Sequence, residues 1–190
     1  MGGTMTDEQL VAKLKAGETG AFDLLYQRHG PPLLNFINRI IQDRDRAEDL
    51  LQETFLRVFR HVSKYRPEAK VSTWIYRIAT NLCYNELRSR RRHRLVSIDG
   101  REDARIESSL CQSSTRCDDP HASLVLDEEI RQVEAGIASL PENERIVLVL
   151  RFYHGYSYAE IAEILACPLG TVKSRLHAAV HHLRRVLKRE

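Results

Sequence analysis

The sequence has few of the features that mark secreted, membrane-spanning or metal-binding proteins. It contains only four cysteines in 190 residues and no CxxC pair, which argues against a disulfide framework and favours a reduced, cytoplasmic protein. No apolar run approaches the roughly 20 residues that span a bilayer. Residues 1–10 lack the basic start and apolar stretch of a secretion signal. We therefore expect no membrane insertion.

Motifs for catalysis are also missing. The chain has no GxxxxGK[ST] phosphate loop, no HExxH metal motif, and no carboxylate cluster of the kinase or nuclease type. His177 and His181 stand at a metal-ligand spacing, but no carboxylate or thiolate is placed beside them. We expect neither an enzyme nor a metal or cofactor site.

Positive charge is present but unevenly distributed. The formal net charge is only +3, yet residues 88–94 read RSRRRHR and the last twenty residues carry six basic side chains against one acid. Residues 107–134, between these blocks, hold seven acids and two arginines. Two basic regions joined by a non-basic spacer indicate two contacts with a polyanion.

The hydrophobic pattern predicts an all-α protein of two small helical domains joined by a flexible linker. Helices are expected at 21–29, 33–41, 45–61, 72–92, 124–139, 141–153, 158–166 and 171–188, with a short one after Thr6. Gly30, Pro31 and Pro32 are expected to break the second region into two helices. The expected divisions are a tail with a short helix at 1–19, domains at 20–94 and 124–190, and a linker at 95–123. An ordered surface loop is the alternative for the linker.

The C-terminal domain carries a helix-turn-helix pattern. Ser157 and Glu160 form a capping box before a short apolar-faced helix, residues 167–170 break the chain, and a longer amphipathic helix follows. The outer face of that longer helix would lie in the major groove of DNA. Ser174 and His177 are candidate base readers, and Lys173, Arg175 and Arg184 are candidate phosphate contacts. A solvated basic helix is the alternative.

The expected helix at 45–61 has an apolar residue within its polar face. Asp49, Gln52, Glu53 and Leu56 lie opposite the predicted core stripe. A small apolar spot surrounded by charges suits a helix-on-helix protein contact. A single exposed leucine is also common on solvated faces, so both interpretations stand.

The helix at 72–92 and the loop before it suit unpaired nucleic acid. One face combines aromatic, arginine and amide side chains, which stack on bases, contact phosphates and read base edges. The preceding loop, residues 63–71, adds basic and aromatic side chains that could hold an unstacked base. The candidates are Tyr65, Arg66, Trp74, Arg77, Asn81, Tyr84, Asn85 and Arg88. Alternatively, Trp74 and Tyr84 anchor the core.

Four segments in this order resemble the bacterial RNA polymerase sigma factors of the extracytoplasmic-function (ECF) type. They are AEDLLQETFLRVFR (47–60), STWIYRIATNLCYNELR (72–88), LPENERIVLVLRFYHGYSYAEIAEIL (140–165) and GTVKSRLHAA (170–179). The resemblance covers about residues 20–94 and 124–188. It implies a sigma-2 helical bundle and a sigma-4 helix-turn-helix domain in a cytoplasmic, non-catalytic protein.

The resemblance also implies partners. The Asp49–Leu56 face would bind the clamp helices of the largest polymerase subunit, and the flap would be a further contact. The loop at 63–71 with Trp74, Asn81 and Asn85 would hold the melted −10 strand. The helix that begins at Thr171 would read the −35 element of promoter DNA. An anti-sigma factor would be the expected inhibitor.

Two departures and one rival function remain open. Ala178 stands where relatives often carry an arginine, and Cys111 and Cys117 in the linker could form a redox switch or be ordinary thiols. The rival is a free-standing helix-turn-helix repressor or activator, which would bind duplex DNA alone, usually as a dimer. An enzyme acting on nucleic acid is a distant third possibility.

Overall fold

The computed structural model describes residues 5–97 and 120–188 and is built from helices throughout those ranges. The elements are α1 (Asp7–Lys15), α2 (Gly20–Ile41), α3 (Arg44–His61), the short 3-10 helix η1 (Val62–Lys64), α4 (Val71–Ser97), α5 (Pro120–Ser139), α6 (Glu142–Phe152), α7 (Tyr158–Leu165) and α8 (Leu169–Leu187). The all-α prediction is confirmed. Within the described ranges, no helix combines the length and apolar character needed to cross a membrane.

The capping signals in the sequence set the helix ends. The Thr6 hydroxyl accepts a hydrogen bond from the Gln9 backbone, and Ser157 does the same for Glu160, so both helix starts are capping boxes. Gly17 and Gly155 follow helix ends with φ of +91° and +70°, a conformation that costs glycine little. The predicted starts of α1 and α7 and the predicted ends of α1 and α6 therefore hold closely.

The predicted break at Gly30, Pro31 and Pro32 is wrong, because α2 runs through all three residues. Each proline removes one backbone hydrogen bond, which costs about 3 kcal/mol in a helix interior. Both prolines lie on the exposed side, where water can solvate the freed carbonyls. The other side buries Leu33, Phe36, Ile37 and Ile40 completely, at roughly 1.5–3 kcal/mol for each side chain. Burial along one face therefore outweighs the two lost hydrogen bonds.

The expected linker is shorter than its predicted limits. Helix α4 continues to Ser97 and α5 begins at Pro120, so both ends of residues 95–123 are helical. The last part of α4 includes the arginine-rich run, and arginine is a good helix former. The rest of the linker, with Cys111 and Cys117, lies outside the described residues.

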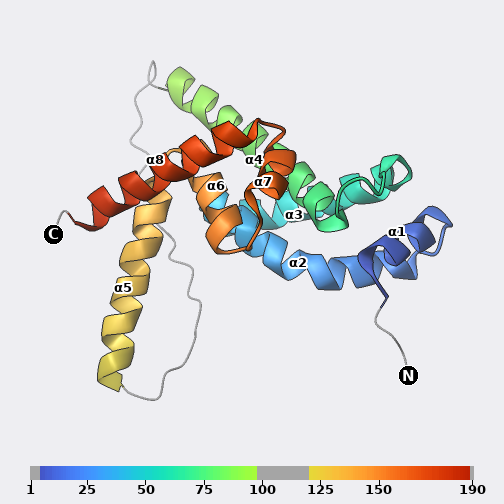
Figure 1. Ribbon diagram of the computed structural model, residues 1–190, viewed down its shortest axis with the longest axis horizontal. Coiled ribbons are helices and arrows are strands. Elements are labelled where there is room, and N and C mark those ends of the chain that lie inside the picture. Colours follow the sequence, from blue (N-terminus) through green and yellow to red (C-terminus); the bar gives the residue numbers. More distant parts are fainter. Residues whose placement is uncertain (1–4, 98–119, 189–190) are drawn as a thin grey trace.

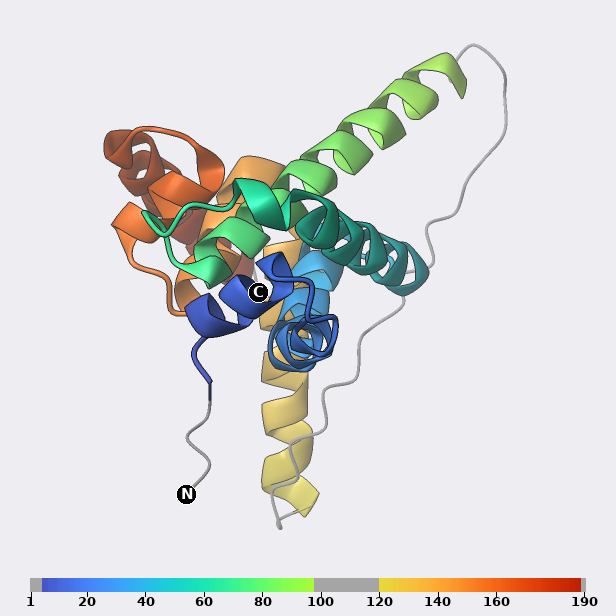
Figure 2. The ribbon, with the colours of Figure 1, turned by 90° about the vertical axis from the view of Figure 1, so that its right-hand side faces the viewer.

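The helices form two packed groups that also contact each other. In the N-terminal half (residues 5–97), α2 packs against α1, α3 and α4, and in the C-terminal half (residues 120–188), α8 packs against α5, α6 and α7. Helices α4 and α7, and α2 and α6, meet between the halves (Figure 1). The end of α4 and the start of α5 project from this body (Figure 2).

Candidate nucleic-acid and protein interfaces

Helix α3 separates a buried stripe from an exposed polar face, as its sequence predicts. The Asp43 side chain caps the helix by accepting from the Arg46 backbone N–H at 3.0 Å. The predicted core residues are all buried: Ala47, Leu50, Leu51, Thr54, Phe55 and Val58. Asp49, Gln52 and Leu56 are exposed, and Glu53 is half-buried. The candidate protein-binding residues therefore share one accessible face.

The apolar part of this face is larger than the sequence suggests. Leu56 and Phe59 are each 48% exposed, and they lie one helical turn apart on α3. The Phe59 ring stands edge-on to Phe22 of α2, with the ring centroids 5.6 Å apart. Phe59 was missed as a candidate, although its i+3 spacing from Leu56 was a usable signal. A surface that combines exposed apolar and charged side chains suits a protein partner.

The outer face of α4 presents most of the predicted strand-binding side chains. Arg77, Asn81, Asn85 and Arg88 are exposed, and Trp74 is half-buried. The opposite side of the same helix contributes Ile75, Ala79, Leu82 and Cys83 to the core. Burial raises the pKa of the Cys83 thiol to about 12, so this cysteine is inert at neutral pH. The exposed row can contact phosphates and base edges along about three helical turns.

Tyr65 differs from the other candidates because its side chain is buried. Only 6% of the residue is exposed. Its hydroxyl donates to the Ala69 carbonyl oxygen at 2.7 Å, and its ring lies 5.2 Å from the Trp74 ring, centroid to centroid. Burial raises the pKa of this phenol. Tyr65 thus links two parts of the loop by a hydrogen bond and packs against Trp74, while neighbouring Arg66 is exposed.

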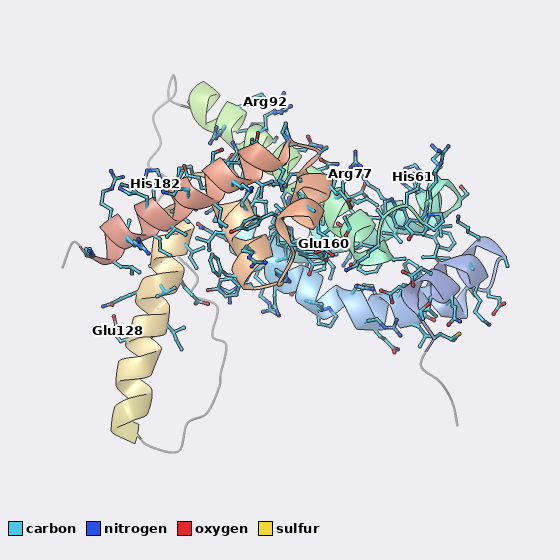
Figure 3. All side chains as sticks on the ribbon, in the orientation of Figure 1. His61, Arg77, Arg92, Glu128, Glu160 and His182 are labelled. Atoms are coloured by element: carbon cyan, nitrogen blue, oxygen red, sulfur yellow. The ribbon has the colours of Figure 1, made fainter. Side chains whose placement is uncertain are left out.

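The C-terminal half contacts three basic or aromatic residues around this face. Lys70 donates to Glu160 of α7 at 2.7 Å, the Tyr84 hydroxyl donates to Asn143 of α6 at 2.9 Å, and Arg91 pairs with Glu142 at 3.1 Å. Figure 3 shows Glu160 on α7 in the region where that helix meets α4.

Two pKa changes accompany these contacts. The hydrogen bond from Lys70 lowers the pKa of the Glu160 carboxyl to about 2, and the same bond raises the pKa of Lys70. Burial raises the pKa of Tyr84. Tyr84 is therefore engaged by protein in this arrangement and is not free to stack on a base.

Helices α7 and α8 form the helix-turn-helix that the sequence predicts, with a shorter turn. Helix α7 ends at Leu165, Ala166 adopts a left-handed conformation with φ of +48°, and α8 begins at Leu169 rather than Thr171. A left-handed non-glycine residue costs roughly 1 kcal/mol, which the packing of both helices must offset. Val172, Leu176 and Ala179 of α8 are buried and hold it against α6 and α7.

The outer face of α8 is accessible. Lys173, Ser174, His177 and Arg184 are exposed, whereas Thr171 and Arg175 are half-buried. The Ser174 hydroxyl donates to the Thr171 carbonyl oxygen at 3.0 Å, so a base contact would compete with this bond. The described residues contain no group of three or more side chains able to hold a metal ion.

Sequence reasoning missed a polar and aromatic cluster between the halves. The Tyr76 hydroxyl lies 2.9 Å from His154 Nδ1, and the His154 ring also contacts Phe36, with ring centroids 5.7 Å apart. Burial lowers the pKa of His154 to about 4, with a smaller contribution from nearby Arg39. Arg39 itself donates to Glu134 at 2.9 Å. These contacts join residues far apart in the chain, so no local pattern predicts them.

Comparison with known proteins identifies the family. Residues 25–93 match the family model for Sigma-70 region 2, and residues 130–183 match the one for Sigma-70 region 4. The chain is 34% identical to the RNA polymerase sigma-H factor of Pseudomonas aeruginosa over 182 residues, 96% of this chain and 94% of that protein. It is 36% identical to the ECF RNA polymerase sigma-E factor of Escherichia coli K12 over 177 residues, 92% of this chain and 91% of that protein.

Solved structures agree on the fold. The sigma factor RpoE of Bartonella quintana, solved with the anti-sigma factor NepR, superposes with a TM-score of 0.71 at 24% identity, covering 89% of this chain and 98% of that one. CnrH, solved with the cytosolic domain of CnrY, gives a TM-score of 0.67 at 21% identity, covering 95% and 96%. Two matched regions in order and relatives aligned over nearly the whole length lead to one assignment: the chain belongs to the ECF group of the sigma-70 family of RNA polymerase sigma factors.

Proposed function

We propose that this protein is a sigma subunit that directs core RNA polymerase to specific promoters and helps to melt them. One observation carries the proposal: a single chain holds both family regions, in order, and each presents an accessible polar helix face. In this proposal, residues 20–94 bind core polymerase and the −10 element, residues 124–190 bind the −35 element, and residues 95–123 link them. The protein performs no catalytic step of its own and acts in the cytoplasm.

The polymerase contact is assigned to the exposed face of α3. Asp49, Gln52, Glu53 and Leu56 would meet the clamp helices of the largest subunit, and the flap would be a second contact. The exposed Leu56 side chain, surrounded by these polar groups, supports a helix-on-helix interface. Phe59 extends the same apolar spot.

The melted −10 strand is assigned to α4 and to the loop before it. Trp74 would stack on an unpaired base, which is worth roughly 1–3 kcal/mol per base. Arg66, Arg77 and Arg88 would contact phosphates, and Asn81 and Asn85 would contact base edges. Tyr65 would act indirectly, because it is buried behind Trp74. Tyr84 would join this surface once its bond to Asn143 is broken.

The −35 element is assigned to α8. Ser174 and His177 would face base edges in the major groove, and Thr171, Lys173, Arg175 and Arg184 would contact the phosphate backbone. Partners of two kinds follow from this function. One is promoter DNA, and the other is an anti-sigma factor, such as the NepR with which the Bartonella quintana relative was solved.

The rival function, a free-standing helix-turn-helix repressor or activator, accounts for the C-terminal half alone. It leaves the region 2 match and the exposed face of α4 without a role. The deciding experiment is in vitro transcription with core polymerase on a promoter library, with and without this protein. Promoter-dependent initiation only in its presence supports the proposal. Tight binding to duplex DNA without polymerase, and no initiation, would support the rival.

A further inference from the structure

Helix α1 lies before the region 2 match, which begins at residue 25. Its first turn is fastened to α2: the Asp7 carboxylate lies 2.7 Å from His29 Nε2 and also pairs with Arg28, which in turn donates to the Met5 carbonyl oxygen at 3.0 Å. Leu10, Val11 and Leu14 are buried beneath the helix. α1 is therefore held rigidly on the N-terminal half.

The last turn of α1 reaches the loop that precedes α4. Lys15 Nζ donates to the Tyr65 carbonyl oxygen at 2.7 Å and lies 5.6 Å from the centroid of the Tyr65 ring. Tyr65 in turn bonds to Ala69 and packs on Trp74. A continuous set of contacts thus runs from a rigid helix, through one lysine, to the tryptophan assigned to base stacking.

The partners of Lys15 are unusual for a surface lysine. Within the described part of the chain it forms no ion pair with a carboxylate, whereas Lys13, on the same helix, pairs with Glu18 at 2.7 Å. Lys15 instead gives its charge-assisted hydrogen bond to a loop carbonyl, a stronger bond than one between neutral groups. The bond therefore restrains the backbone at Tyr65.

We propose that Lys15 is a positioning residue for strand capture, which fixes the loop at 65–70 so that Trp74 is ready to receive an unpaired base. The inference rests on the proposed function. Ordering a flexible loop costs conformational entropy at every residue that becomes fixed. A loop ordered before DNA arrives removes that cost from the binding step, which is the general advantage of preorganisation.

The first test uses the free, full-length protein and three variants. Lys15→Met removes the charge and the donor while keeping the length of the side chain, Lys15→Arg keeps a donor, and Lys13→Met is the matched control on α1. Trp74 is the only tryptophan in the sequence, so its fluorescence reports on the loop directly. We expect stronger acrylamide quenching and a red-shifted emission for Lys15→Met, and wild-type behaviour for the other two.

The second test measures melting by the holoenzyme on a promoter that the wild-type protein has selected from a library. Loss of one charge-assisted hydrogen bond predicts open-complex formation about five- to tenfold slower for Lys15→Met. Core binding should stay unchanged, and Lys15→Arg should restore the rate. A general loss of stability would instead affect core binding and the helical circular dichroism signal.

The outcomes are distinguishable. If the wild-type protein gives no promoter-dependent initiation, the proposed function fails. If the wild type is active and Lys15→Met matches Lys13→Met in both tests, the positioning role of Lys15 is wrong. Slow melting with unchanged Trp74 fluorescence also overturns it, because Lys15 would then act on the DNA directly.

Discussion

The half-buried histidine between the halves, His154, should make the stability of the folded protein depend on pH. His154 has a pKa of about 4 in the folded chain against an ordinary value of 6.5. As the pH falls below 6.5, the unfolded chain binds a proton that folded His154 does not accept, so the unfolded state gains relative stability. The stabilisation is complete above pH 6.5 and is lost as the pH falls toward 4.

The geometry explains why the folded state resists protonation. A charged imidazole needs acceptors for both of its N–H groups. His154 Nδ1 has the Tyr76 hydroxyl at 2.9 Å, but Nε2 is buried and has no hydrogen-bond partner. The groups around the ring come from two packed elements: Phe36 and Arg39 from α2, and Tyr76 from α4. The Arg39 charge further opposes a second positive charge.

The size of the effect follows from the two pKa values. Their difference corresponds to about 3 kcal/mol at the low-pH limit, and to about 2 kcal/mol between pH 7 and pH 5. Because His154 is only partly shielded from solvent, we expect a measured loss of about 1–2 kcal/mol over that interval. At pH 5 most carboxylates are still ionised, and comparison with a variant that lacks this histidine isolates its own contribution.

Urea unfolding at pH 7 and at pH 5 measures this loss for the wild type and for His154→Asn. Asn places a hydrogen-bonding atom near the position of Nδ1 but does not titrate. The variant should be less stable at pH 7, because it loses ring packing, and its stability should change less between the two pH values. His177→Asn, at an exposed site, is the matched control. An equal loss between pH 7 and pH 5 in the wild type and in His154→Asn would refute the reasoning.

Three further predictions concern the assigned surfaces. Leu56→Glu should weaken binding to core polymerase at least tenfold, since burying a leucine is worth about 1.5–3 kcal/mol. Leu24→Glu, at a similarly exposed site on α2, is the control. An unchanged pull-down of polymerase by Leu56→Glu would show that this face is not part of the interface. Trp74→Ala should impair promoter melting by roughly tenfold or more while core binding persists; normal permanganate reactivity of the −10 region would contradict the stacking role. His177→Ala should change the preferred −35 sequence in a selection experiment, whereas Lys173→Ala should weaken binding to all sequences alike. If His177→Ala also lowers the affinity for all sequences equally, His177 contacts a phosphate and does not read a base.

The parts of the fold that local patterns control could be predicted from the sequence. The buried stripe of α3 follows from its 3.6-residue period, and the start of α7 follows from Ser157 and Glu160. The continuity of α2 could not be predicted in this way. Its two prolines locally favour a break in the helix. The burial of Phe36 and its neighbours, which depends on other helices, outweighs that preference.

The sequence could predict which residues share a candidate surface, but not which of them the other half of the protein covers. Helical period alone places Arg77, Asn81 and Asn85 on one exposed face of α4. The same period places Tyr84 there, yet it contacts Asn143, which lies 59 residues away in the sequence. The partial burial of His154 could not be predicted, because the residues that surround it belong to α2 and α4. Contacts between the halves depend on how the halves pack together, and no short stretch of sequence determines that packing.

The ion pairs between the halves have a consequence for the proposed function. The carboxylates of Glu160 and Glu142 hold Lys70 and Arg91 at the distances that phosphate oxygens would take. Nucleic acid that binds this face in the proposed way would therefore compete with the protein's own acidic side chains for the same cations. Added salt should weaken both competitors, so the salt dependence of DNA binding by the free chain should be shallower than its exposed basic residues alone would give.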